Sequence, residues 1–168
     1  MSSLERFPQI CRDISKHLKP VRDRGIVVAF QPNFPRKWGE AIEAIGDGIL
    51  RIVFLECEPL KKTGVSRIGG EDRITLLLHF ALGQKFFEDN GTGSIELLSQ
   101  VGTLLQGFKP NEWCGLIQLG TLRQNQPIGD YWIFEQQIQF NAIAQPSQNA
   151  PINKEPLLLE TIVNQSIQ

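Results

Sequence analysis

The sequence predicts an α+β fold: a mostly antiparallel β-sheet packed by about two helices, with a long loop between two strands and an extended C-terminal tail. Two segments repeat their apolar residues at steps of three and four, the period of an amphipathic helix. Several others alternate in character from one residue to the next, as half-buried strands do. The 168 residues, 41% of them hydrophobic, suffice for one core. We therefore expect one domain over residues 1–144 and a polar extension over residues 145–168.

Two helices are expected at widely separated places in the chain. The first covers residues 4–18, and the second covers residues 94–106, with Ser94 as its N-cap and Gly107 as its stop. A weaker helical pattern lies within residues 35–48. The apolar stripe of the second helix is expected to hold Ile95, Leu98, Val101, Leu105 and Phe108.

Apolar and alternating runs bounded by glycine, proline and polar residues predict the strands. These runs are residues 25–30, 49–56, 74–82, 116–122 and 131–144. The second and third of them are expected to pair as neighbours. In the last strand, one set of alternate residues is mostly apolar and the other is polar, and this difference predicts which face of the strand is buried. We expect one core to contain Trp132, Phe134, Phe140, Leu78, Phe80 and Leu98.

The opposite face of the last strand is polar and carries Glu135, Gln137 and Gln139. A sheet with such a strand has one side in water or one side against a partner. These three residues are therefore candidates for contact with another subunit.

Charge and cysteine content narrow the classes of function. Seventeen basic and eighteen acidic residues give a net charge of −1, which does not predict nucleic-acid specificity. Three cysteines without metal-type spacing predict reduced thiols. The N-terminal segment lacks the apolar region of a secretory signal, and the most apolar run is too short to span a bilayer, so we expect synthesis in the cytoplasm and no membrane span.

No motif predicts catalysis, cofactor binding or metal binding, and we expect none of these. The glycine-rich segments lack the lysine of a phosphate-binding loop. His17 and His79 stand alone, and a histidine inside an apolar strand such as His79 is more often a core or sheet-face residue than a catalyst. We expect a protein that is not an enzyme.

The loop between the two central strands mixes basic and acidic side chains. Lys61, Lys62 and Arg67 lie within it, and Glu71 and Asp72 follow it. A long loop of mixed charge is typical of a surface that contacts another subunit. The alternative is a small metal-dependent hydrolase or nuclease that uses Glu71 and Asp72 together with Glu56 and Glu58.

The polar extension regains apolar character only near its end, where Leu158 and Ile162 lie. A short apolar segment on a polar tether can dock on a neighbouring subunit. A frayed terminus explains the same composition equally well. Both interpretations stay open at this point.

Four segments, taken with the order of the elements, carry a resemblance to a known family. They are residues 49–55, 70–80, 104–110 with its Gly-Phe-Lys-Pro ending, and the aromatic strand 131–140. In this order they resemble the tail-terminator, or tail-completion, proteins of Mu-like contractile phages and related contractile injection systems. The chain departs from that family in its extension after residue 145, which is rich in Gln, Asn and Pro.

The resemblance implies a homo-oligomer, a hexameric ring incorporated at one end of a phage-like particle. Such a ring sits on the last ring of the tail tube, stops polymerisation of tube and sheath, and offers a surface to a neck or cap partner. A baseplate or connector position in the same kind of particle is the alternative, because ring-forming tail proteins share small α+β domains.

Overall fold

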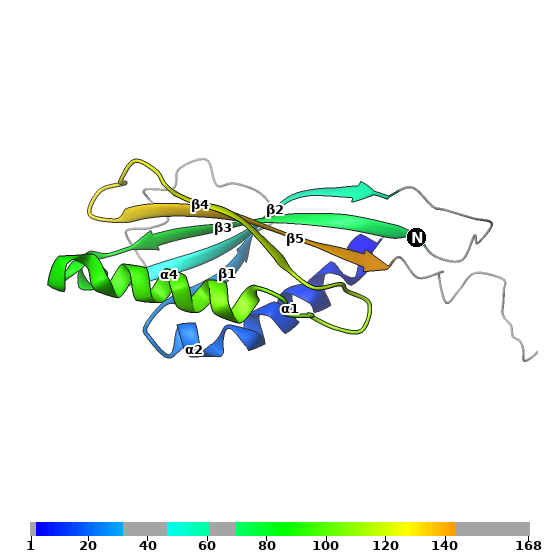
Figure 1. Ribbon diagram of the computed structural model, residues 1–168, viewed down its shortest axis with the longest axis horizontal. Coiled ribbons are helices and arrows are strands. Elements are labelled where there is room, and N and C mark those ends of the chain that lie inside the picture. The colour runs from blue at the N-terminus through cyan, green and yellow to red at the C-terminus, as the bar shows by residue number, and fades with distance from the viewer. Residues whose placement is uncertain (1–2, 32–46, 61–69, 144–168) are drawn as a thin grey trace, which may run out of the picture.

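The computed structural model describes residues 3–31, 47–60 and 70–143, and Figure 1 shows their arrangement. Two main helices and five strands form the domain, joined by short helical turns. The elements in chain order are η1 (Ser3–Arg6), α1 (Phe7–His17), α2 (Lys19–Arg22), β1 (Val27–Gln31), β2 (Gly48–Pro59), β3 (Glu71–Leu82), η2 (Gln84–Phe87), η3 (Asp89–Gly91), α4 (Thr92–Leu105), β4 (Gln118–Gln124) and β5 (Trp132–Ile143).

The strands form one sheet in the order β1-β2-β3-β5-β4. β1 runs parallel to β2, and the other three pairs of neighbours are antiparallel. The expected pairing of the two central strands is confirmed, with Ile52 opposite Leu78. The α+β class with a mostly antiparallel sheet is therefore the fold of this chain.

The main core lies between the sheet and the helices α1 and α4, which cover the same face of it (Figure 1). Residues of β3 with even numbers point to this face because side chains alternate along a strand. Leu76, Leu78 and Phe80 are almost completely buried there. From the helices, Ile10, Ile14, Leu97, Val101 and Leu105 meet them.

The N-cap prediction for the second helix is wrong. α4 begins at Thr92, and Gly91 stands at the N-cap position with φ of 81°. Ser94 lies inside the first turn, where its hydroxyl donates a hydrogen bond of 2.8 Å to the carbonyl of Gly91. Leu97 belongs to the core, whereas Ile95, which was expected on the buried stripe, is 67% exposed. The stop is confirmed, because Gly107 adopts φ of 76° directly after the helix.

β2 and β3 are longer than their apolar runs, since each keeps its partner through the polar residues near the loop. Gly48 begins β2 where an added Cβ would lie 2.9 Å from the carbonyl oxygen of Ala81, so the strand starts at a position that fits glycine alone. The weaker helical pattern of residues 35–48 lies outside the described residues up to position 46. The polar extension beyond Ile143 lies outside them as well.

The expected core is confirmed except at Trp132 and, in part, at Phe134, which is half-buried and packs against the core. Leu78, Phe80, Leu98 and Phe140 are buried. Trp132 is 36% exposed, because it begins β5 at the end of the sheet and packs on Phe87 with 4.8 Å between the ring centroids. The alternation of residues predicted the correct face of the sheet for Trp132 but not its position at the edge of the core.

Truncation to alanine should destabilise the protein to different degrees at Phe80 and at Trp132. Phe80→Ala leaves a cavity between the sheet and both helices and should lower the free energy of unfolding by about 3–5 kcal/mol. Trp132→Ala removes a ring that is already in contact with water, so its effect should be clearly smaller. Urea denaturation of both variants measures this, and equal losses would contradict the peripheral position of Trp132.

Candidate functional site

The face of the sheet opposite α1 and α4, here called the second face, carries the odd-numbered residues of β3 and β5. Four of the predicted contact residues lie on it. Glu71 belongs to β3, and Glu135, Gln137 and Gln139 belong to β5. Strand pairing brings Glu71 and Gln139 to one part of this face, whereas Glu135 lies opposite His79, nearer to the other end of the sheet.

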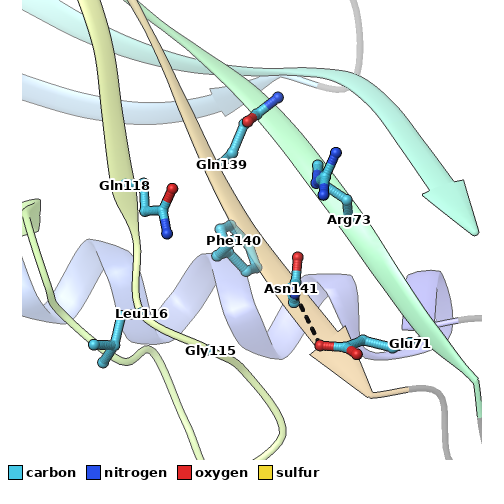
Figure 2. A pocket seen from close by; sticks show the side chains of 8 residues that line it. All are labelled: Glu71, Arg73, Gly115, Leu116, Gln118, Gln139, Phe140 and Asn141. Atoms are coloured by element: carbon cyan, nitrogen blue, oxygen red, sulfur yellow. Dashed lines mark hydrogen bonds between the residues drawn. The ribbon is translucent and has the colours of Figure 1, made fainter. Parts of the chain in front are cut away.

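An open hollow of about 550 Å³ occupies the second face where β3, β5 and the start of β4 meet (Figure 2). Its lining residues are Glu71, Arg73, Gly115, Leu116, Gln118, Gln139, Phe140 and Asn141. Amide and charged side chains project around it in Figure 2. The hollow is therefore a polar depression formed by three adjacent segments of the sheet.

Most polar groups around the hollow already have partners within the chain. The side-chain amide of Asn141 donates to a carboxylate oxygen of Glu71 at 2.9 Å. The amide of Gln139 donates to the hydroxyl of Thr75 at 3.1 Å, and Arg73 lies 3.8 Å from Glu58. These cross-strand contacts hold the side chains in place before any partner arrives, which lowers the entropic cost of binding.

Two apolar side chains stand at the border of this polar surface. Leu116 is 57% exposed and lines the hollow. Ile143 is 51% exposed and lies opposite Glu71 in the register of β3 and β5. Polar groups with a few exposed apolar residues are the composition of an ordinary protein contact surface. We call the hollow together with Ile143 the contact surface.

A row of ionisable side chains crosses the second face nearer to the other end of the sheet. In register, Arg51 of β2 lies opposite His79 of β3, His79 opposite Glu135 of β5, and Glu135 opposite Arg123 of β4. Exposure increases along the row, from 3% at Arg51 and 2% at His79 to an exposed Arg123.

Burial sets the charge state of the inner end of this row. Desolvation lowers the pKa of His79 to about 4, and the positive charge of Arg51 acts in the same direction. Burial also lowers the pKa of Arg51. The imidazole is therefore neutral near pH 7, and its burial agrees with the expectation of a core or sheet-face histidine.

Among the remaining predicted contact residues, the structure describes only Asp72, which does not join this surface. Asp72 is 7% exposed and belongs to the even-numbered set of β3, which faces the helices. The others, Lys61, Lys62, Arg67, Leu158 and Ile162, lie outside the described residues.

Strand pairing separates one acid of the metal-binding alternative from the others, because Asp72 faces the helices whereas Glu56, Glu58 and Glu71 lie on the second face. Glu58 lies opposite Arg73, and Asp72 lies opposite Pro59. Glu71 and Asp72 are consecutive in a strand, so their side chains leave opposite faces of the sheet. Within residues 3–31, 47–60 and 70–143, no three His, Cys, Asp or Glu side chains are grouped as metal ligands would be.

Sequence reasoning missed the row through Arg51 and His79 and the hollow beside Leu116. Both depend on which residues stand opposite each other in the paired strands. The charged Arg51 inside an apolar strand was the available signal, because such a residue needs a polar neighbour across the sheet.

Neither a protein-family model nor a curated protein sequence matches this chain. Among the helices in the described part of the chain, none has the length and apolar character needed to cross a membrane. The geometry of the contact surface is therefore the basis for a proposal about function.

The buried histidine should make stability depend on pH. Its pKa in the folded protein, about 4, lies below the ordinary 6.5, so the unfolded chain takes up a proton first as the pH falls. The contribution of neutral His79 to the free energy of unfolding is therefore fully present above pH 6.5 and is lost as the pH falls toward 4. Between pH 7 and 4.5, wild type should lose about 2–3 kcal/mol more than a His79→Gln variant. Denaturation at both pH values tests this, and parallel losses would contradict it.

Proposed function

We propose that this chain is a structural assembly protein, one subunit of a ring that ends the polymerisation of tube and sheath in a phage-like contractile tail or injection system. The observation that carries the proposal is the contact surface, where preordered amide and charged groups border the exposed Leu116 and Ile143. A surface of this composition suits binding to another protein.

The distribution of exposed apolar residues supports a ring. A closed ring uses heterologous contacts, so each subunit must present two unlike surfaces to its two neighbours. Val27 and Trp132 are exposed at the end of the sheet where β1 and β5 begin, and Leu116 and Ile143 are exposed near the end where β5 finishes. The length of β5 separates these two groups by roughly 35 Å.

The polar character of the contact surface also suits a subunit that exists alone before it assembles. A large exposed apolar patch would promote aggregation of the free protein. Here Glu71 and Asn141 satisfy each other, as do Gln139 and Thr75, so a neighbour can cover them without leaving these groups unpaired.

The oligomer is the first property to test. Native mass spectrometry of the full-length protein should give a single closed multiple of 18.9 kDa, six copies if the ring is hexameric. Antibody labelling of purified particles in the electron microscope should place the chain at one end of the tail. A strict monomer found at no tail end would refute the proposal, and a label at the baseplate would support the alternative position.

A matched pair of substitutions tests the contact surface. Leu116→Glu places a charge beside the hollow and should weaken self-association, while the free energy of unfolding of the free subunit changes by about 0.5 kcal/mol or less. Ile95→Glu is the control, because Ile95 is similarly exposed, at 67%, but lies on α4 in the other layer of the fold. Light scattering over a dilution series compares them, and equal weakening by both variants would contradict a specific surface.

A further inference from the structure

The outer strand β4 has the properties of an edge that receives another strand. Among the described strands it pairs only with β5 and stands last in the sheet. Residues 120–124 are all exposed, whereas the opposite edge, β1, is exposed only at Val27. An edge strand presents backbone groups to any chain of matching pattern.

The direction of these backbone groups follows from the pairing with β5. The N–H of Asn125 donates to the carbonyl of Ile133 at 2.9 Å, so it points toward β5. Alternation then directs the N–H groups of Gln124 and Leu122 away from β5. At the start of the strand, the side chain of Gln106 already receives the outward N–H of Leu119, at 3.1 Å. The carbonyl of Gly120 accepts a hydrogen bond of 2.8 Å from the side-chain amide of Gln136, so the open part of the edge is residues 121–124.

We propose that residues 157–163 of a neighbouring copy add as a strand to this open edge of β4. The inference depends on the ring proposed above, for which it names the connection between subunits. The added segment reads Leu-Leu-Leu-Glu-Thr-Ile-Val, which includes Thr, Ile and Val, residues favoured in strands. Backbone hydrogen bonds would provide the affinity, and the side chains would determine which segment binds.

The side chains of β4 match this segment in charge and polarity. Arg123 lies opposite Glu135, on the second face, whereas Leu122 lies opposite Gln136, on the helix-covered face, and is 40% exposed. A register that places Glu160 beside Arg123 directs Leu159, Thr161 and Val163 to the face of Leu122. The acid then meets a base, and Leu159 and Val163 extend the partly exposed border of the core. Leu158 and Ile162 lie on the same side as Glu160 in this register.

For antiparallel addition, the pairing that β4 already makes with β5, the place where the chain leaves the sheet favours a neighbour over the same copy. β5 ends at Ile143, on the contact surface itself, and residues 144–156 connect it to the added segment. Thirteen residues of random coil span roughly 20 Å on average. Antiparallel addition to its own β4 would start near Gln124, which pairs opposite Phe134, roughly 30 Å along β5 from Ile143. The edge of a neighbouring copy is not held at this fixed distance.

Disulfide trapping between two full-length variants tests the docking directly. One carries Arg123→Cys and the other Glu160→Cys, both in a Cys57→Ser background. The other native cysteines are buried, and burial raises the pKa of Cys11 to about 12 and that of Cys114 to about 11, so neither should compete for oxidation. Mild oxidation of the mixture should give a crosslinked dimer containing one chain of each kind.

A backbone substitution provides the second measurement. Gln124→Pro removes an outward N–H and should raise the apparent dissociation constant about fivefold, as the loss of one hydrogen bond would. Gln124→Ala keeps the N–H and should leave self-association as in wild type. Urea denaturation of both variants as free subunits confirms that the fold is intact, and equal self-association of the two would contradict pairing at this edge.

The outcomes separate this inference from the proposed ring. If wild type is oligomeric but the mixture gives no crosslinked dimer, the strand addition is refuted and the ring is not. If a chain carrying both cysteines crosslinks only within itself, the segment occupies its own edge and the proposal of a neighbour fails. If wild type is monomeric at every concentration, the proposed function fails and this inference fails with it.

Discussion

The pairing of β3 along its whole length with two neighbours is the constraint on which the rest of the structure depends. Each residue from Glu71 to Leu82 has a partner on β5, and nearly all have one on β2. The strand is buried on both faces over most of its length. A slip of one residue would exchange its two faces and move His79 into the core under the helices. The set of β3 residues buried under the helices and the lining of the hollow both depend on this register.

The same register explains how the sheet tolerates Arg51 and His79 at almost complete burial. A second positive charge beside Arg51 would be unfavourable in a region of low dielectric constant, and the neutral imidazole avoids it. Glu135, on the other side of His79, supplies the nearest opposite charge in the row. A shift of one, two or three residues in either direction would place Arg51 against an apolar residue of β3, so the buried row favours one alignment of the strands.

The periodicity of apolar residues in the sequence predicted those features of the fold that depend on residues close together in the chain. It identified both main helices, the strands, the pairing of β2 with β3 and the polar side of β5. It failed where distant parts of the chain decide the outcome. The position of Trp132 depends on where the sheet ends, the start of α4 on the conformation of Gly91, and the row through His79 on a pairing between strands. The hollow beside Leu116 likewise required the segment before β4 to lie next to β5, which no spacing in the sequence indicates.

The second face changes from buried to polar and exposed across the sheet, and this gradient bears on the proposed assembly. On β2 and β3 it is buried around Val53 and His79, whereas on β5 and β4 it is polar and exposed up to Arg123. A charge on an edge strand disfavours pairing with most chains, because the charge must be desolvated or matched. It does not disfavour a segment that carries an acid at the facing position. Because of Arg123, the edge of β4 can therefore stay unpaired in the free subunit and still accept one particular strand. An assembly that starts and stops at defined places, such as the ring proposed above, requires this property.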